Sequence, residues 1–167
     1  MCAPRYTRAE GSSLYVLLLA FLIGIVAGLR ALTAPAVIAW GAAAGVIGVG
    51  GALLRFFAFP WTPWIVSALA LAEFVTDQLP GTPSRTVPVQ FGTRLISGAL
   101  CGAALGYADA AAWSGAAAGV AGAVIGTLGG HAARARLARA FGRDRPAAFL
   151  EDAVAIGGSL LVVFAVP

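Results

Sequence analysis

Charge is scarce in this sequence, and lysine is absent from it. Only 11% of the 167 residues are charged, whereas a soluble globular domain carries about 25%. All eleven basic residues are arginine, and seven acids leave a formal net charge of +4. Nucleic-acid binding requires arginines gathered on a soluble face, but most of these border apolar stretches. The composition therefore argues against a soluble domain and against a nucleic-acid partner, and it predicts a membrane protein.

Cysteine and histidine are also rare, which leaves little material for a metal site or a disulfide framework. Cys2 lies at the terminus and Cys101 inside an apolar stretch, far apart in sequence, so neither kind of site is indicated. His131 is unaccompanied, whereas metal ligands usually cluster. The sequence contains no nucleophile elbow, no HExxH motif and no Walker loop. We therefore expect no metal and no cofactor, and the sequence indicates no enzyme.

Long apolar runs are what the sequence has in abundance, and a membrane span needs about 20 such residues. Residues 14–54 cover twice that length with one charge, Arg30. This run should form two helices that meet at residues 33–35, because proline suits the first turn of a helix. The second helix should close at residues 55–60. Further spans are expected over about 61–78, 94–109, 114–130 and 147–166. These patterns predict an all-α, polytopic transmembrane bundle of about six helices, one domain over residues 14–166 after an N-terminal tail of residues 1–13.

The arginines divide unequally between the two sides that six spans define. Eight fall in turns and loops on one side and three on the other. The positive-inside rule then predicts a multi-pass protein of a bacterial inner membrane, with its basic loops in the cytoplasm and both termini in the periplasm. Five arginines follow the fifth span: Arg134, Arg136, Arg139, Arg143 and Arg145. They form either a solvated helix end that snorkels to the headgroups or a dedicated site for lipid headgroups.

An internal repeat is visible in the glycines. Residues 41–46 and 115–120 both read GAAAGV, and the same shift of 74 residues places Gly24 on Gly98. The predicted repeat units are residues 14–92 and 93–166. Each contains three spans, so the copies would have opposite orientations, as in transporters and some channels. The small-xxx-small glycine pairs also predict close helix packing without any pore, and a surplus glycine face is a candidate contact for a homo-oligomer.

Two acids and one arginine stand out inside the predicted spans. Glu73 and Asp77 are four residues apart and so share one face of a helix. A carboxylate deep in the membrane costs about 2.5–3.5 kcal/mol on insertion scales, and Arg30 at the same end is the expected partner. The candidate binding or transport residues are Arg30, Glu73, Asp77, Arg85, Glu151 and Asp152.

Two functions remain open for this charged site. In the first, the protein is a small transporter or channel for an unknown ion or solute, in which Arg30 fixes an anionic group or neutralises the acids. Glu73 is then the carboxylate that responds to a proton or cation. In the second, the protein is a non-transporting structural or accessory membrane protein whose charges are salt bridges that lock helices together. Membrane lipids are partners in both.

Four segments together resemble a known family: GLRALTAPAVIAW, LALAEFVTDQLPGTPSRTVP, residues 94–102 and FLEDAVAIGG. This is the group of small bacterial integral membrane proteins catalogued as domain of unknown function 4126, and the resemblance covers residues 14–158. Its glycine-leucine-arginine element falls on residues 28–30, its acidic helix on Glu73 and Asp77, and its proline-containing loop on residues 80–85. Gln78 stands where such sequences often carry lysine. The resemblance implies a polytopic helical membrane protein and no particular activity.

Overall fold

The computed structural model describes residues 6–77 and 87–166, with side chains placed from residue 13 onward except at 144 and 145. All regular structure in this part of the chain is helical, so the predicted all-α class is confirmed. The elements are α1 (Tyr6–Leu29), α2 (Thr33–Ala43), α3 (Gly51–Leu54), the 3₁₀ turn η1 (Arg55–Ala58), α4 (Thr62–Thr76), α5 (Pro88–Gly106), α6 (Ala112–Phe141) and α7 (Asp144–Phe164).

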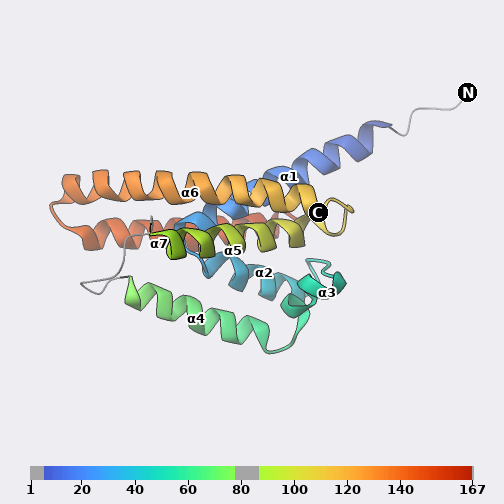
Figure 1. The fold of residues 1–167 in the computed structure, drawn as a ribbon, viewed down its shortest axis with the longest axis horizontal. Helices are drawn as coiled ribbons and strands as arrows, with labels where there is room; N and C mark the ends of the chain where they lie inside the picture. Colours follow the sequence, from blue (N-terminus) through green and yellow to red (C-terminus); the bar gives the residue numbers. More distant parts are fainter. Residues whose placement is uncertain (1–5, 78–86, 167) are drawn as a thin grey trace, which may run out of the picture.

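The longer helices run back and forth along one axis (Figure 1). α1, α4 and α6 lead toward the end where α6 turns into α7, and α2, α5 and α7 lead back. α6 is the centre of the packing, since its most extensive contacts are with α1 and α5. The first turns of α1 project beyond the other helices (Figure 1), and the end of α7 lies beside the middle of α1, where the Tyr15 hydroxyl donates a hydrogen bond of 2.8 Å to the Ala165 carbonyl oxygen.

Glycines allow α1, α5 and α6 to approach one another closely. A Cβ added at Gly24 of α1 would lie 2.8 Å from the carbonyl carbon of Gly119 in α6, and one at Gly98 of α5 would lie 2.7 Å from the Gly119 oxygen. Real Cβ atoms do not approach backbone so closely, so these positions exclude any side chain. The predicted close packing at small residues is confirmed, and it accounts for these glycines without a pore.

The prediction of one long second helix, from residues 33–35 to residues 55–60, is wrong, because the helix ends early. α2 ends at Ala43, and only single turns, α3 and η1, follow before α4. Gly45 and Gly51 have φ of +75° and +73°, a left-handed conformation that glycine adopts without steric cost. The α3–η1 segment then meets α4 at an angle of 79°. The apolar run that was long enough for a second span therefore folds as the short helix α2, followed by the single turns α3 and η1.

Two helices of the described chain, α6 and residues 146–164 of α7, are long and apolar enough to cross a membrane. The bent pair 51–58 and 62–76 makes a third if it counts as one span. α2 has 11 residues, too few to span the hydrocarbon core, and polar Gln90 and Arg94 lie early in α5. The structure thus supports a membrane protein with two or three candidate spans, and the six-span bundle stays a prediction.

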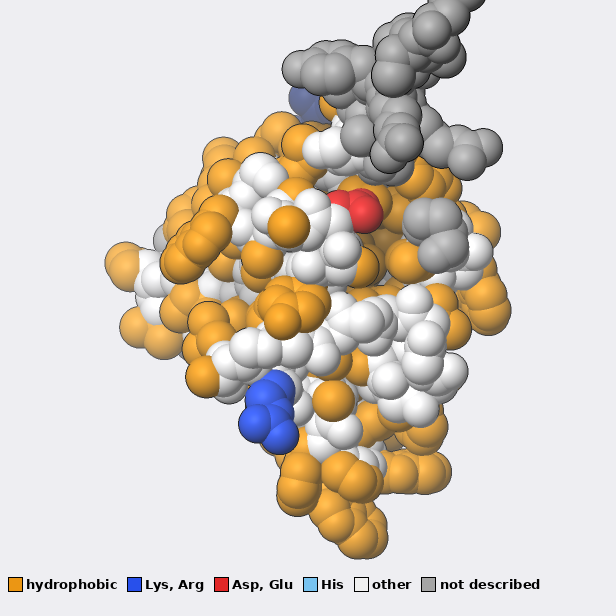
Figure 2. All heavy atoms as spheres, turned by 90° about the vertical axis from the view of Figure 1, so that its right-hand side faces the viewer, with side chains coloured by type: hydrophobic (Ala, Val, Ile, Leu, Met, Phe, Trp, Pro, Cys, Tyr) orange, Lys and Arg blue, Asp and Glu red, His pale blue; other side chains and the backbone are white. Residues whose placement is uncertain are grey.

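Large apolar side chains point outward from α4 and α7. Trp64 and Leu71 are each 63% exposed, Leu161 is 72% exposed and Phe164 is 83% exposed. Figure 2 views the end of the molecule where α7 ends and shows hydrophobic side chains around much of its rim, with backbone and other side chains in the middle and few charges among them. Exposed apolar patches of this extent mark an interaction surface.

Candidate functional site

Arg30 joins three helices from the break between α1 and α2. It follows the last residue of α1, and none of its surface is exposed. Its Nη1 donates to Asp77 Oδ2, at the end of α4, over 2.5 Å, and its Nη2 donates to Asp152 Oδ1 of α7. The Phe74 ring centroid lies 5.0 Å from the guanidinium carbon, within the range of a cation–π contact. Arg30 was expected to pair with the acids of the helix that carries Glu73 and Asp77. It pairs with Asp77 and with Asp152, whereas the hydrogen bonds of Glu73 go to backbone amides.

Glu73 binds the backbone just after Arg30. Its two carboxylate oxygens accept hydrogen bonds from the Ala31 and Leu32 N–H groups at 2.9 Å and 3.0 Å. These amides precede α2, so the carboxylate sits at the positive end of that helix dipole. Glu73 therefore occupies the kind of position where a helix N-terminus binds an anion.

Arg94 completes the cluster, and sequence reasoning missed it. Its side chain is 1% exposed, and its Nη1 donates to the carbonyl oxygens of Gly28 and Leu29 at 2.9 Å and 2.6 Å. Its Nη2 lies 3.8 Å from Glu73 Oε1. Arg94 thus satisfies the carbonyls that the end of α1 leaves without helical partners.

The error over Arg94 has a clear origin. A helix beginning at Arg94 was expected, which made this arginine one of the cytoplasmic loop charges, but α5 begins at Pro88. The available signal was its register. Arg94 is three, four and seven residues from Ser97, Gly98 and Cys101, and such spacing places all of them on one helical face. An arginine on the small-residue packing face must be buried and needs an internal partner.

Two hydroxyl groups serve the same helix break. Ser97 Oγ donates to the Ala31 carbonyl oxygen at 2.5 Å. Thr127 Oγ1 of α6 shares its one proton between the Ala123 oxygen of its own helix at 2.8 Å and the Gly28 oxygen at 3.2 Å. An interrupted helix in an apolar medium must have its freed backbone groups satisfied by neighbouring helices. Here α4, α5 and α6 each supply such a side chain.

Replacing Thr127 with valine tests this contribution. We expect the free energy of unfolding to fall by about 1 kcal/mol, because valine keeps the shape and removes one buried hydrogen-bond donor. Thr93→Val is the control, since the Thr93 hydroxyl is exposed and bonds only within its own helix. Reversible unfolding in mixed detergent micelles, followed by circular dichroism, measures both. Equal effects of the two changes would contradict a special role for Thr127.

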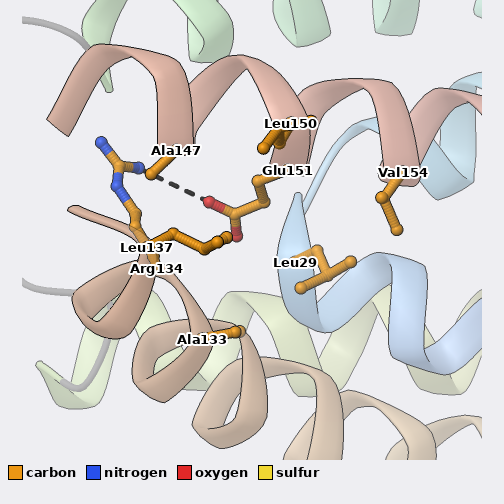
Figure 3. A pocket seen from close by; sticks show the side chains of 9 residues that line it. Leu29, Ala133, Arg134, Leu137, Ala147, Leu150, Glu151 and Val154 are labelled. Carbon is orange, nitrogen blue, oxygen red and sulfur yellow. Dashed lines mark ion pairs between the residues drawn. The ribbon is translucent and has the colours of Figure 1, made fainter. Parts of the chain in front are cut away.

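Glu151 does not belong to the cluster, which corrects its predicted place beside Asp152 at the rim. Its carboxylate lies 3.6 Å from Arg134 Nη1 of α6, and its side chain is 7% exposed. Figure 3 shows this ion pair beside a small cavity between α6 and α7. Consecutive residues of a helix point about 100° apart because a turn holds 3.6 residues. Asp152 therefore reaches Arg30 while Glu151 faces α6.

The remaining predicted residues lie away from the cluster or outside the described part. Arg85, with the loop residues 80–85 and Gln78, falls in residues 78–86, which the structure does not describe, and the side chain of Arg145 is likewise outside it. Arg136, Arg139 and Arg143 are exposed. α6 continues to Phe141, so most of the basic stretch is the exposed end of this helix.

No protein-family model, curated protein or solved structure matches this chain. Among the described residues, no group of three His, Cys, Asp or Glu is placed to hold a metal ion. The resemblance to the uncharacterised membrane family stays a prediction.

Proposed function

We propose that this chain is a multi-pass integral membrane protein whose buried charges fasten its helices around the α1–α2 break, and that its role is architectural or accessory. The observation that carries the proposal is the use of Arg30. Its side chain is wholly buried, and its two terminal nitrogens are each bound to a carboxylate from a different helix. Because both terminal nitrogens are used in ion pairs within the chain, this guanidinium serves to hold helices together.

The side chains of Glu73 and Arg94 are likewise bound by groups of the same chain. Glu73 is bound to two backbone amides, and Arg94 to two backbone carbonyls. An unpaired ion in this setting would cost several kcal/mol, and pairing with good hydrogen-bond geometry offsets that cost. The cluster therefore acts on the helix break and on the packing of α4, α5 and α7 against it.

Transport is the second candidate, and one observation favours it. Asp77 and Asp152 keep 13% and 14% of their side chains exposed, so the cluster has an outer edge that a proton or cation can reach. Broken helices whose ends face a charged site are typical of transporters. In this role, Glu73→Gln abolishes proton or cation flux into vesicles that contain the folded protein.

The finer expectations about architecture and location are proposals too. We propose an inner-membrane location with the basic end of α6 in the cytoplasm and both termini outside, on the positive-inside rule. The inverted repeat rests on α1 and α5, which run in opposite directions and both contact Gly119. Self-association is proposed through the exposed apolar faces of α4 and α7, because the small-residue pairs of α1, α5 and α6 are used in packing within the chain.

Water access to the helix break distinguishes the two functions. Thr33 follows the break and is 4% exposed, and cysteine is close to threonine in size. We expect Thr33→Cys, in a background with Cys2 and Cys101 changed to serine, to resist a membrane-impermeant thiol reagent applied from either side. Ala135→Cys on the exposed end of α6 is the control that should react. Rapid labelling at Thr33→Cys would mean that water reaches the helix break, which would contradict the architectural role and favour transport.

A further inference from the structure

A cavity of about 140 Å³ lies between α6 and α7, with Leu29 of α1 on its third side (Figure 3). Its walls are mainly aliphatic: Leu137 comes from α6, and Leu150 and Val154 come from α7. The charged side chains that line it are Arg134 and Glu151. The cavity therefore combines an apolar interior with one charged edge.

The cavity lies where α6 changes character. Residues 112–130 carry no charge, and residues 131–143 carry His131 and four arginines. The residues of α6 that line the cavity are Gly130, Ala133, Arg134 and Leu137, which begin where the apolar part ends. In a membrane-spanning helix this change marks the boundary between hydrocarbon and headgroups.

We infer that this cavity is a binding site for one anionic phospholipid, with part of an acyl chain between α6 and α7 and the phosphate at Arg134. Apolar walls suit an acyl chain. Arg134 is 17% exposed and lies on a helix end that also carries Arg136 and Arg139, so a negative headgroup meets complementary charge. A guanidinium has five N–H donors, which lets Arg134 hold Glu151 and a phosphate together.

Glu151 has a defined part in this site. Its carboxylate, 3.6 Å from Arg134, holds the guanidinium beside the cavity and also partly neutralises it. The inference rests on the membrane location alone and on neither the fastening nor the transport role. Its failure would leave both of those proposals untouched.

Native mass spectrometry of the full chain, titrated with lipids in detergent, tests the inference. Phosphatidylglycerol and phosphatidylcholine with identical chains are the two lipid probes, and inorganic phosphate is the third. We expect one phosphatidylglycerol to bind about fivefold more tightly than phosphatidylcholine, the ratio that one arginine near the surface contributes. Equal affinity of the two lipids, or phosphate binding as tight as that of the lipid, would overturn the proposal.

Variants separate this cavity from general lipid contact. Val154→Trp fills the cavity, and we expect it to weaken phosphatidylglycerol binding at least fivefold, because burial of about two methylene groups of an acyl chain already contributes more than that ratio. Leu161→Trp is the matched control on α7, because Leu161 is exposed and does not line the cavity. An equal loss in both variants would overturn the site. Ala133→Leu fills the cavity from the α6 side and should repeat the loss if Val154→Trp does not fold.

Charge variants test the headgroup contact separately. Arg134→Gln should remove the preference for phosphatidylglycerol, whereas Arg136→Gln, outside the cavity lining, should keep most of it. Glu151→Gln should raise the preference, because it removes a negative charge beside Arg134 while the amide oxygen can still accept a hydrogen bond from the guanidinium. A preference that falls in Glu151→Gln, with Arg134 unchanged, would contradict the assignment of the phosphate to Arg134.

Discussion

Replacing Arg30 with methionine is expected to lower the free energy of unfolding by about 3–5 kcal/mol. This is the usual loss when one partner of a buried ion pair is removed. Methionine fills much of the space, but Asp77 and Asp152 would face each other without the cation that now binds both. The connections from the helix break to α4 and α7 would be lost together. Unfolding of the purified protein in mixed micelles, followed by circular dichroism, measures the change.

Two further variants decide whether this loss is electrostatic. Arg55→Met is the control, because Arg55 is an exposed arginine at the α3–η1 bend, and it should change stability little. A triple variant, Arg30→Met with Asp77→Asn and Asp152→Asn, removes the uncompensated charges and should recover part of the lost stability. Unchanged stability in Arg30→Met alone would refute the fastening role. A triple variant less stable than the single one would refute the electrostatic cause.

Changing Gly119 to alanine is expected to cost about 3 kcal/mol, at the upper end of the range for overpacked cores. A Cβ at this position would lie 2.8 Å from the carbonyl carbon of Gly98 and 3.3 Å from the Cα of Gly102. Both are backbone atoms of α5 and cannot move aside as a side chain can. Insertion of one methyl group must therefore push α5 and α6 apart, which weakens dispersion contacts along both helices.

Gly129 supplies the matched control on the same helix. A Cβ added at Gly129 meets nothing within 4 Å, so Gly129→Ala should leave stability unchanged or raise it by as much as about 1 kcal/mol through helix propensity. Thermal unfolding monitored by size-exclusion chromatography in detergent ranks the two variants. Equal behaviour of Gly119→Ala and Gly129→Ala would contradict the close approach of α5 and α6.

Composition was enough to predict the class of this protein. Few charges and long apolar runs indicate a helical membrane protein, because hydropathy is a sum over local sequence and needs no knowledge of packing. The spacing of Glu73 and Asp77 similarly indicated a charged helix face, and Arg30 was recognised as its partner. These inferences depend on single residues and on helical periodicity.

The motif GAAAGV shows where local sequence stops being sufficient. At residues 115–120 it lies within the continuous helix α6, packed against α1 and α5. At residues 41–46 the same six letters end α2, and Gly45 takes a left-handed conformation. Glycine permits both conformations at little cost, so the neighbours decide between them. For this reason the second predicted helix was wrong although its composition suited a span.

The sequence by itself determined the helical class, the apolar surroundings and the presence of ions that require partners. Only the tertiary structure decided how those ions are used. Arg94, predicted as a loop charge, is buried and donates hydrogen bonds to carbonyl oxygens of α1. Glu73 binds backbone amides. Glu151 pairs with Arg134, whereas Asp152 pairs with Arg30. The physical reason is that a buried charge must find complementary atoms, and those atoms belong to helices far away in sequence.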